Sequence, residues 1–471
     1  MSKFKPGRRL TPAAREHRPV PAPPSAKQGP TSTIVAESDT SIDTPPLDSV
    51  FQEHVSNPTR QFAFKCTLIF LFFRFSFLHE FVSGKIHFDA HILLLFAAIS
   101  YFAAFLAGGL FGAFSEKVTW MWFAFAACMA AATVTSTWRG GSFGLLSSYL
   151  RTTLPFVLLI PAVTFTSAEI RKVLNTIGFA GTVTIVLGLV SSDFKTGRMA
   201  FGSAGSSIQD SNDYAAHLIL LLPAIAFLFF GGKRNVLFKL AGLPFLALGL
   251  YQIFSTGSRG GLVGLMITGL YILRRGTPKV RMAILVAVPV LGLAILLLVP
   301  RDASQRLRSL FNSEDATQEA LESKEARQAL FWASVSITVH HPLLGIGPGE
   351  FMDYQAGIAG ESGQKGMWHD THNGYTQISS ECGVPALIFY LAALWMTYFS
   401  LRRTSKSGVP EVSTIANILS IMMVAYCVCI VFLSQGYNFN LPVITGIATA
   451  LGRLVPQMNS QQASLPAAHA A

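Results

Sequence analysis

Apolar segments of about 20 residues recur along most of this chain, and their length constrains the fold more than any other feature. A helix needs about 20 mostly apolar residues to cross a bilayer. From Phe62 onward, twelve segments approach this length, with approximate limits of 62–82, 89–112, 118–137, 143–165, 172–191, 214–231, 236–255, 260–274, 281–299, 376–400, 413–433 and 440–456. Hydrophobic residues make up 51% of the chain and charged residues 13%. We therefore expect an all-α fold, a polytopic transmembrane helical bundle, rather than several soluble domains.

The Lys and Arg residues of the short loops predict how this bundle is oriented. If the N-terminus is cytoplasmic, the short inner loops carry thirteen Lys or Arg and the short outer loops carry five. Positive residues are retained on the cytoplasmic side, so both termini are expected there. Three polar loops are then expected on the outer side, at 191–213, 256–261 and 300–374. Within the last loop, residues 323–339 have helical spacing and are expected to lie along the membrane surface.

The two ends of the chain differ from its apolar middle. The first 60 residues contain ten prolines, and the first thirty hold seven Lys or Arg with a single acid, Glu16. Such a segment buries too little apolar surface to fold, so residues 1–60 are expected to form a disordered basic cytoplasmic tail. A partner-binding segment and a simple tether both fit this tail. Residues 61–456 form the predicted transmembrane domain, and 457–471 a short cytoplasmic C-terminal tail.

Charge and cysteine content argue against two other classes of protein. The net charge is +11, but Lys and Arg lie in short runs between apolar segments and not in one basic module. Topology explains that distribution better than nucleic-acid binding, so no nucleic-acid partner is expected. The five cysteines show no metal-ligand spacing, and four of them fall in or beside apolar segments. Neither a disulfide framework nor a zinc site is expected.

Two arginines of the predicted outer loops have neighbours that suit phosphate binding. Arg259 stands between the seventh and eighth apolar segments and precedes two glycines that open the eighth. A guanidinium beside the backbone amides of a helix N-terminus forms a site for a phosphate or pyrophosphate. Arg198 precedes Asn212 and Asp213 in another polar loop. The alternatives are an arginine that snorkels to the membrane interface and a basic residue of an ordinary polar loop.

His372 lies just before the tenth apolar segment, where the membrane is expected to meet water. Histidine transfers protons near neutral pH, so His372 suits a base that activates a hydroxyl group, while a purely structural histidine is the alternative. His369 and Asp370 stand close by, but no further Cys or His is placed to complete a metal site, and no metal is expected. Two arginines and a histidine on one face of the membrane would suit an anionic lipid-linked substrate.

Several short motifs, in this order, resemble those of the bacterial O-antigen ligase and O-antigen polymerase family. Arg198 and the Asn212-Asp213 pair match its outer-loop arginine and Asn-Asp motif, and Ser258-Arg259-Gly260 matches its Ser-Arg-Gly turn. Arg327, Leu-Phe-Trp at 330–332 and His-Pro-Leu-Leu-Gly-Ile-Gly-Pro-Gly-Glu-Phe at 341–351 match its signature, followed by His372-Asn373 and Glu381-Cys382-Gly383. The similarity spans roughly residues 198–401. One departure is Gln209-Asp210-Ser211, where the family often has an Asn-Pro pair.

The resemblance implies a GT-C-like glycosyltransferase of the bacterial inner membrane that uses no metal ion or other cofactor. Such an enzyme moves a glycan from undecaprenyl pyrophosphate to an acceptor hydroxyl at the periplasmic face, with inversion at the sugar carbon. Arg198 and Arg259 would hold the pyrophosphate, and His372 would activate the acceptor. Lower-ranked substrate-binding candidates are Arg327, Glu381, Asn212, Asp213 and His369, with Glu381 expected to orient His372. The acceptor stays open among lipid A core for a ligase, a glycan repeat for a polymerase, and a protein hydroxyl for an oligosaccharyltransferase.

A transporter or flippase of polysaccharide precursors is the alternative function, because twelve spans are also common among carriers. Carriers place charged residues near the bilayer midplane and are built from related halves. Lys65, Arg74 and Arg151 fall within apolar segments and best support this alternative, unless they snorkel to the interface. The candidate site residues lie instead at one face of the membrane, and no repeat is visible, which favours the glycosyltransferase.

Overall fold

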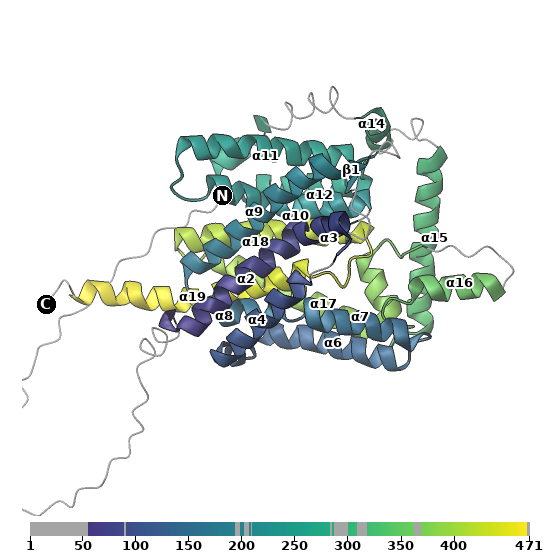
Figure 1. Cartoon of the computed structure of the whole chain (residues 1–471), viewed down its shortest axis with the longest axis horizontal. Helices are drawn as coiled ribbons and strands as arrows, with labels where there is room; N and C mark the ends of the chain where they lie inside the picture. The colour runs from purple at the N-terminus through teal and green to yellow at the C-terminus, as the bar shows by residue number, and fades with distance from the viewer. Residues whose placement is uncertain are drawn as a thin grey trace, which may run out of the picture. The chain divides into compact units, whose positions relative to one another are not determined.

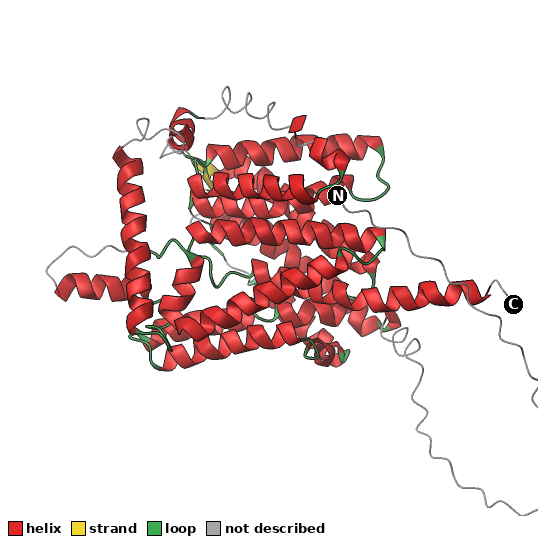
Figure 2. Cartoon of the chain, turned by 180° about the vertical axis from the view of Figure 1, so that it is seen from behind, coloured by secondary structure: helices red, strands yellow, loops and turns green. Residues whose placement is uncertain are grey.

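A computed structural model describes residues 55–88, 91–193, 198–201, 207–208, 210–282, 285–286, 300–308, 318–361 and 369–468. The chain divides into two units, Met1–Leu47 and Asp48–Ala471, and all described residues belong to the second. This unit is built from helices, with one antiparallel pair of short strands, β1 (Ser192–Asp193) and β2 (Ala200–Phe201) (Figures 1 and 2). The tail predicted at 1–60 lies outside the described residues as far as residue 54.

Helices occur at eleven of the twelve predicted apolar segments, and the twelfth, 281–299, lies mostly outside the described residues. The first half of the unit contains α2 (Pro58–Ser76), α3 (Leu78–Ile86), α4 (Ile92–Leu106), α5 (Gly109–Ala113), α6 (Lys117–Val134), α7 (Arg139–Thr152), α8 (Phe156–Val163) and α9 (Ser167–Ser191). The second half contains α10 (Ser211–Phe230), α11 (Val236–Ser255), α12 (Arg259–Arg275), α14 (Arg301–Arg308), α15 (Gln318–His340), α16 (Phe351–Glu361), α17 (Gly374–Thr404), α18 (Pro410–Cys429), the short 3-10 helix η2 (Ile430–Phe432) and α19 (Asn440–Ala468).

Seven helical segments of the described chain are long and apolar enough to cross a membrane. The pair α2 and α3 adds an eighth if it counts as one span, although the chain bends by 68° between them at Phe77. The protein is therefore an all-α membrane protein, while the predicted total of twelve spans stays a prediction. The predicted tail at 457–471 is partly helical, because α19 continues to Ala468.

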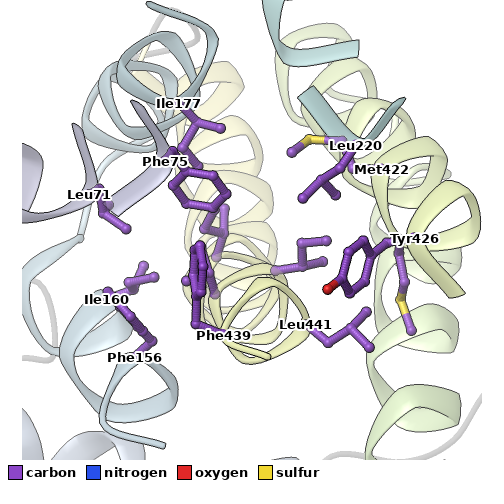
Figure 3. Packing of buried hydrophobic residues seen from close by; sticks show 14 of the residues in the cluster. Leu71, Phe75, Phe156, Ile160, Ile177, Leu220, Met422, Tyr426, Phe439 and Leu441 are labelled. Atoms are coloured by element: carbon purple, nitrogen blue, oxygen red, sulfur yellow. The ribbon is translucent and has the colours of Figure 1, made fainter. Parts of the chain in front are cut away.

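One hydrophobic core joins the helices, and the start of α19 lies inside it (Figure 3). The ring of Phe439 contacts Phe75 of α2 and Phe156 of α8, with centroid distances of 5.0 and 6.2 Å. Helices in lipid associate through close packing, since the surrounding chains are as apolar as the helices themselves. Gly178 of α9 illustrates this packing, because an added Cβ would lie 2.4 Å from the Ala224 carbonyl oxygen of α10.

The three polar loops predicted on one side of the membrane gather at one end of the bundle. Strand β2 contacts α10, α14 contacts the neighbouring helices α11 and α12, and α15 packs on α17. Helix α15 runs across this end, while long helices such as α11 and α18 run along the bundle (Figure 1). The helix predicted at 323–339 is confirmed, and its place on the membrane surface stays a prediction.

Residues 341–351 form a loop that is fastened to α17 where this helix breaks. The break lies at Gly383, whose φ is +84° and ψ 169°. A broken helix leaves backbone groups without partners, and such groups are costly inside a membrane protein. The loop supplies these partners. Three backbone hydrogen bonds join the two segments: Ile346 N to Ser380 O (3.1 Å), Gly347 N to Glu381 O (2.9 Å) and Val384 N to Pro342 O (2.7 Å).

We predict that Gly345→Ala lowers the melting temperature of the purified protein, because Gly345 combines a φ of +64° with close approach to α17. An added Cβ would lie 2.3 Å from the Glu381 carbonyl carbon, so the backbone itself would have to shift. We expect a loss of about 2 kcal/mol or more in the free energy of unfolding. Gly144→Ala in α7 is the control, since no atom lies within 4 Å of its added Cβ. Equal melting temperatures for the two variants would contradict this account.

Candidate active site

Arg198 is held against the turn between α11 and α12. Its Nε donates to the Thr256 carbonyl (2.8 Å), and its Nη2 donates to Asn212 Oδ1 (3.1 Å). The Met199 amide also donates to the Ser255 carbonyl (2.9 Å), so the backbone follows the same turn. The motif of Arg198 and Asn212 is therefore brought next to the turn that precedes Arg259, as a shared site requires.

Helix α10 begins with an acidic cap that orients Asn212. The Asp210 carboxylate accepts from the Asn212 backbone amide (3.1 Å) and from Asn212 Nδ2 (2.8 Å). Asp is a favoured helix cap, which gives a physical reason for the departure from the family motif at 209–211. With its amide nitrogen bound to Asp210, Asn212 turns its oxygen toward Arg198.

A narrow pocket lies at the N-terminus of α12, and we call it the α12 pocket. Ser258 is the N-cap of α12, and its Oγ accepts from the Gly261 amide (3.1 Å). First-turn amides lack partners within a helix and carry partial positive charge, so this position suits an anion. Half-buried Arg259 is the first residue of α12. The lining residues are Asn212, Ala216, Ser258, Gly260, Gly261, Arg327, Cys429, Phe432 and Leu433.

The two glycines after Arg259 are required by packing. An added Cβ on Gly260 would lie 2.7 Å from the Cβ of Phe432, and one on Gly261 would lie 3.0 Å from the Cβ of Ala215. Larger side chains would push the start of α12 away from η2 and α10. The glycines therefore keep the amides of α12 beside the residues that line the pocket.

Arg327 brings α15 and the long loop into the α12 pocket. Buried Leu330 and Ile337 of α15 pack with Ile346 and Phe351, which belong to the loop fastened to α17 and the start of α16. Arg327 was a lower-ranked candidate in the sequence, because its position depends on this long-range packing. The structure places it among the residues that line the pocket.

His372 is held in a strained backbone conformation next to the same pocket. Its φ is +50°, which is unfavourable for a residue with a Cβ. The His372 amide donates to Ser434 Oγ (2.8 Å), and Thr371 Oγ1 lies 3.1 Å from the same atom. Leu433, the neighbour of Ser434, lines the α12 pocket. Strain that is fixed by surrounding contacts is typical of functional sites.

The electrostatic environment of His372 favours its neutral form. Burial lowers the pKa of His372 below its ordinary value of 6.5, and the positive charge of Arg327 lowers it further. The carboxylates of Asp370 and Asp210 oppose this shift, and His369 acts in the same direction as Arg327. At neutral pH the imidazole is therefore uncharged and able to accept a proton.

Glu381 contacts the loop at 341–351. This buried carboxylate accepts from the Gly349 amide (2.8 Å) and from the Tyr437 hydroxyl (2.7 Å). The structure records no contact between Glu381 and His372 among the described residues. Glu381 thus supports the loop on α17, and its predicted role in orienting His372 stays a prediction.

The described residues also bear on metal and disulfide chemistry. His369 and Asp370 are exposed just before His372. In the part of the chain that the structure describes, no group of three or more His, Cys, Asp or Glu side chains lies close enough to hold a metal ion. All five cysteines are free, and one of them, Cys429, lines the α12 pocket.

Ser434 is a site residue that sequence reasoning missed. It begins a polar run, Ser434 to Asn438, that follows the eleventh apolar segment on the predicted outer side. This polar run, directly after an apolar segment, was the sequence feature from which Ser434 could have been identified. Three further members of this segment make contacts near the site: Gly436 N donates to Gln377 Oε1 (3.1 Å), Tyr437 donates to Glu381, and Gln435 lines a second pocket.

Comparison with known proteins agrees with the resemblance drawn from the motifs. A family model described as O-antigen ligase matches residues 244–391, which include Arg259, Arg327, His372 and Glu381. No curated protein gives a significant match. Arg198 and Asn212 lie outside the matched range. Arg198 nevertheless donates to Thr256 within it, and Asn212 lines the α12 pocket. The matched range thus includes His372 and part of the α12 pocket, and residues 244–391 of the chain are similar to the O-antigen ligase family.

Proposed function

We propose that this protein is a membrane glycosyltransferase that moves a glycan from undecaprenyl pyrophosphate to an acceptor hydroxyl at the periplasmic face. The observation that carries the proposal is the α12 pocket with His372 beside it. An anion-binding helix N-terminus, arginines and a neutral histidine lie together at one end of the bundle. The family similarity suggests the class of reaction. The residues at this site supply groups suited to binding the pyrophosphate and to accepting the proton of the acceptor.

The α12 pocket would bind the pyrophosphate of the donor. Arg327 and the first-turn amides of α12 supply positive charge from two sides, and Arg259 begins the same helix. Hydrogen bonds between cationic groups and phosphate oxygens are stronger than neutral ones. Arg198 adds charge and, through Asn212 and Thr256, fixes the two segments that form the pocket.

The transfer would be a single displacement at the sugar carbon. The acceptor oxygen forms a bond to this carbon while the bond from the carbon to the pyrophosphate oxygen breaks, and the electron pair leaves with the pyrophosphate. Neutral His372 takes the proton of the attacking hydroxyl, and the cationic pocket stabilises the charge gained by the leaving group. Such a single displacement would invert the configuration at the sugar carbon.

The acceptor class is tested by transfer in proteoliposomes. The purified protein would be reconstituted with labelled undecaprenyl-pyrophosphate glycan and offered lipid A core, glycan repeat units or a protein with Ser and Thr hydroxyls separately. Covalent labelling of one acceptor supports the transferase and identifies its type. A transporter would move the label across the bilayer without attaching it to any acceptor.

We predict that His372→Ala and Arg259→Ala abolish glycan transfer in cells while the lipid-linked donor accumulates. Losing a general base lowers rates by about 10²- to 10⁴-fold, and losing a group that stabilises the leaving charge by about 10²- to 10³-fold. Two controls test whether the loss depends on these two positions and not on removing any histidine or arginine. His340→Ala removes an exposed histidine at the end of α15, and Arg275→Ala removes an exposed arginine at the far end of α12. Both controls should transfer normally, and normal transfer by His372→Ala would exclude His372 from the mechanism.

We also predict that the acid limb of the kcat/KM profile has its midpoint below pH 6.5. Only neutral His372 accepts a proton, and its pKa is lowered, so activity persists until the pH falls through that lowered value. Arg327→Gln removes a positive charge that lowers this pKa, and its midpoint should move to higher pH. Asp370→Asn removes a negative charge that raises it, and its midpoint should move to lower pH. Midpoints that move together would contradict the assignment of His372 as the base.

A further inference from the structure

The segment from Leu433 to Tyr437 connects the α12 pocket to α17, and we call it the 433–437 segment. Its first residue, Leu433, lines the α12 pocket. Its far end is bound to α17 by two hydrogen bonds. The Gly436 amide donates to Gln377 Oε1 (3.1 Å), and the Tyr437 hydroxyl donates to Glu381 Oε2 (2.7 Å). The segment is therefore fixed to one face of α17, and its position is set over its whole length.

Two glycines allow the 433–437 segment to lie directly against the start of α17, just after His372. An added Cβ on Gly374 would lie 3.1 Å from the Gly436 amide nitrogen, and one on Gly436 would lie 2.8 Å from the Gly374 carbonyl oxygen. The two backbones thus meet without a side chain between them. A larger residue at either position would move the segment away from His372.

Two hydroxyl groups hold the backbone around His372. The hydroxyl of buried Thr371 donates to the Asn373 carbonyl (3.2 Å), so its oxygen can accept from the Ser434 hydroxyl, 3.1 Å away. Ser434 Oγ in turn accepts from the His372 amide (2.8 Å). In this arrangement each of the three donors has an acceptor. The network binds the backbone of His372 and makes no use of its imidazole.

The bond to Ser434 supports an unfavourable backbone conformation at His372. The φ of His372 is +50°, which residues with a Cβ rarely adopt. Such a conformation persists only where the surrounding contacts impose it. Without the bond to Ser434, the backbone would be free to relax toward a negative φ. This change would turn the Cβ and the attached imidazole in another direction.

We propose that Ser434 is a positioning residue, which holds His372 in the orientation needed for proton transfer, and that Thr371 assists it. This inference rests on the proposed function, in which His372 accepts the proton of the attacking hydroxyl. A general base must lie within hydrogen-bond reach of that proton, and a small displacement greatly lowers the rate. Loss of the Ser434 hydroxyl therefore acts on kcat. A residue that only shaped the pocket wall beside Leu433 would act instead on the KM for the donor.

The test measures kcat and the KM for the labelled undecaprenyl-pyrophosphate glycan in proteoliposomes, with the acceptor that becomes labelled there. Ser434→Ala should lower kcat about 10- to 100-fold and leave the KM for the donor within about threefold of the wild-type value. Thr371→Val keeps the shape of the side chain but removes its hydroxyl, and it should also lower kcat. Thr371→Ser keeps the hydroxyl and should retain most of kcat. Ser336→Ala is the control, because it removes an exposed hydroxyl of α15 and should change neither constant.

The outcomes separate this inference from the proposed function. An active wild-type protein whose Ser434→Ala variant keeps its kcat, or changes only in the KM for the donor, would overturn the positioning role alone. If Ser434→Ala does not fold, the two Thr371 variants decide, and equal kcat values for them would overturn the role of the hydroxyl network. A wild-type protein that labels no acceptor would overturn the proposed function.

Discussion

A backbone group inside a membrane protein must find a hydrogen-bond partner within the protein, and this requirement organises the site. Helix α17 breaks at Gly383, and amides of the loop at 341–351 pair with the carbonyls that the break leaves open. The Glu381 carboxylate adds a further bond to this loop at Gly349. Because α15 packs on the same loop, the pairing also fixes the helix that carries Arg327. The motif at 341–351 thus supports the α12 pocket without lining it.

Three helices begin around the proposed site, at Ser211, Arg259 and Gly374. Each helix N-terminus carries partial positive charge, and this charge is strongest over its first turn. Side chains cap the three ends: Asp210 at α10, Ser258 at α12 and Asn373 at α17. The caps leave the remaining amides and the arginines as sources of positive potential. The helix ends and the arginines thus supply positive charge at the proposed diphosphate site, next to the carboxylates of Asp210 and Asp370.

Sequence reasoning predicted the features that depend on local pattern. Apolar length located the helices, and the motifs gave Arg198, Arg259 and His372 as candidates, because a short stretch of chain carries each signal. Their roles stay predictions. Features that depend on contacts between distant segments were missed. Ser434 holds His372, and Arg74, which counted toward a carrier, lies over Phe439 and lines a cavity. No single-segment pattern encodes such contacts.

Arg327 lines the α12 pocket, and its positive charge lowers the pKa of His372. An incoming diphosphate would offset the guanidinium charge and thereby raise the proton affinity of the imidazole. Under the proposed function, donor loading and the basicity of His372 would be thermodynamically linked, with a weaker base in the empty protein than in the loaded one. In the proposed reaction, such linkage would favour deprotonation of the acceptor after the activated sugar is in place.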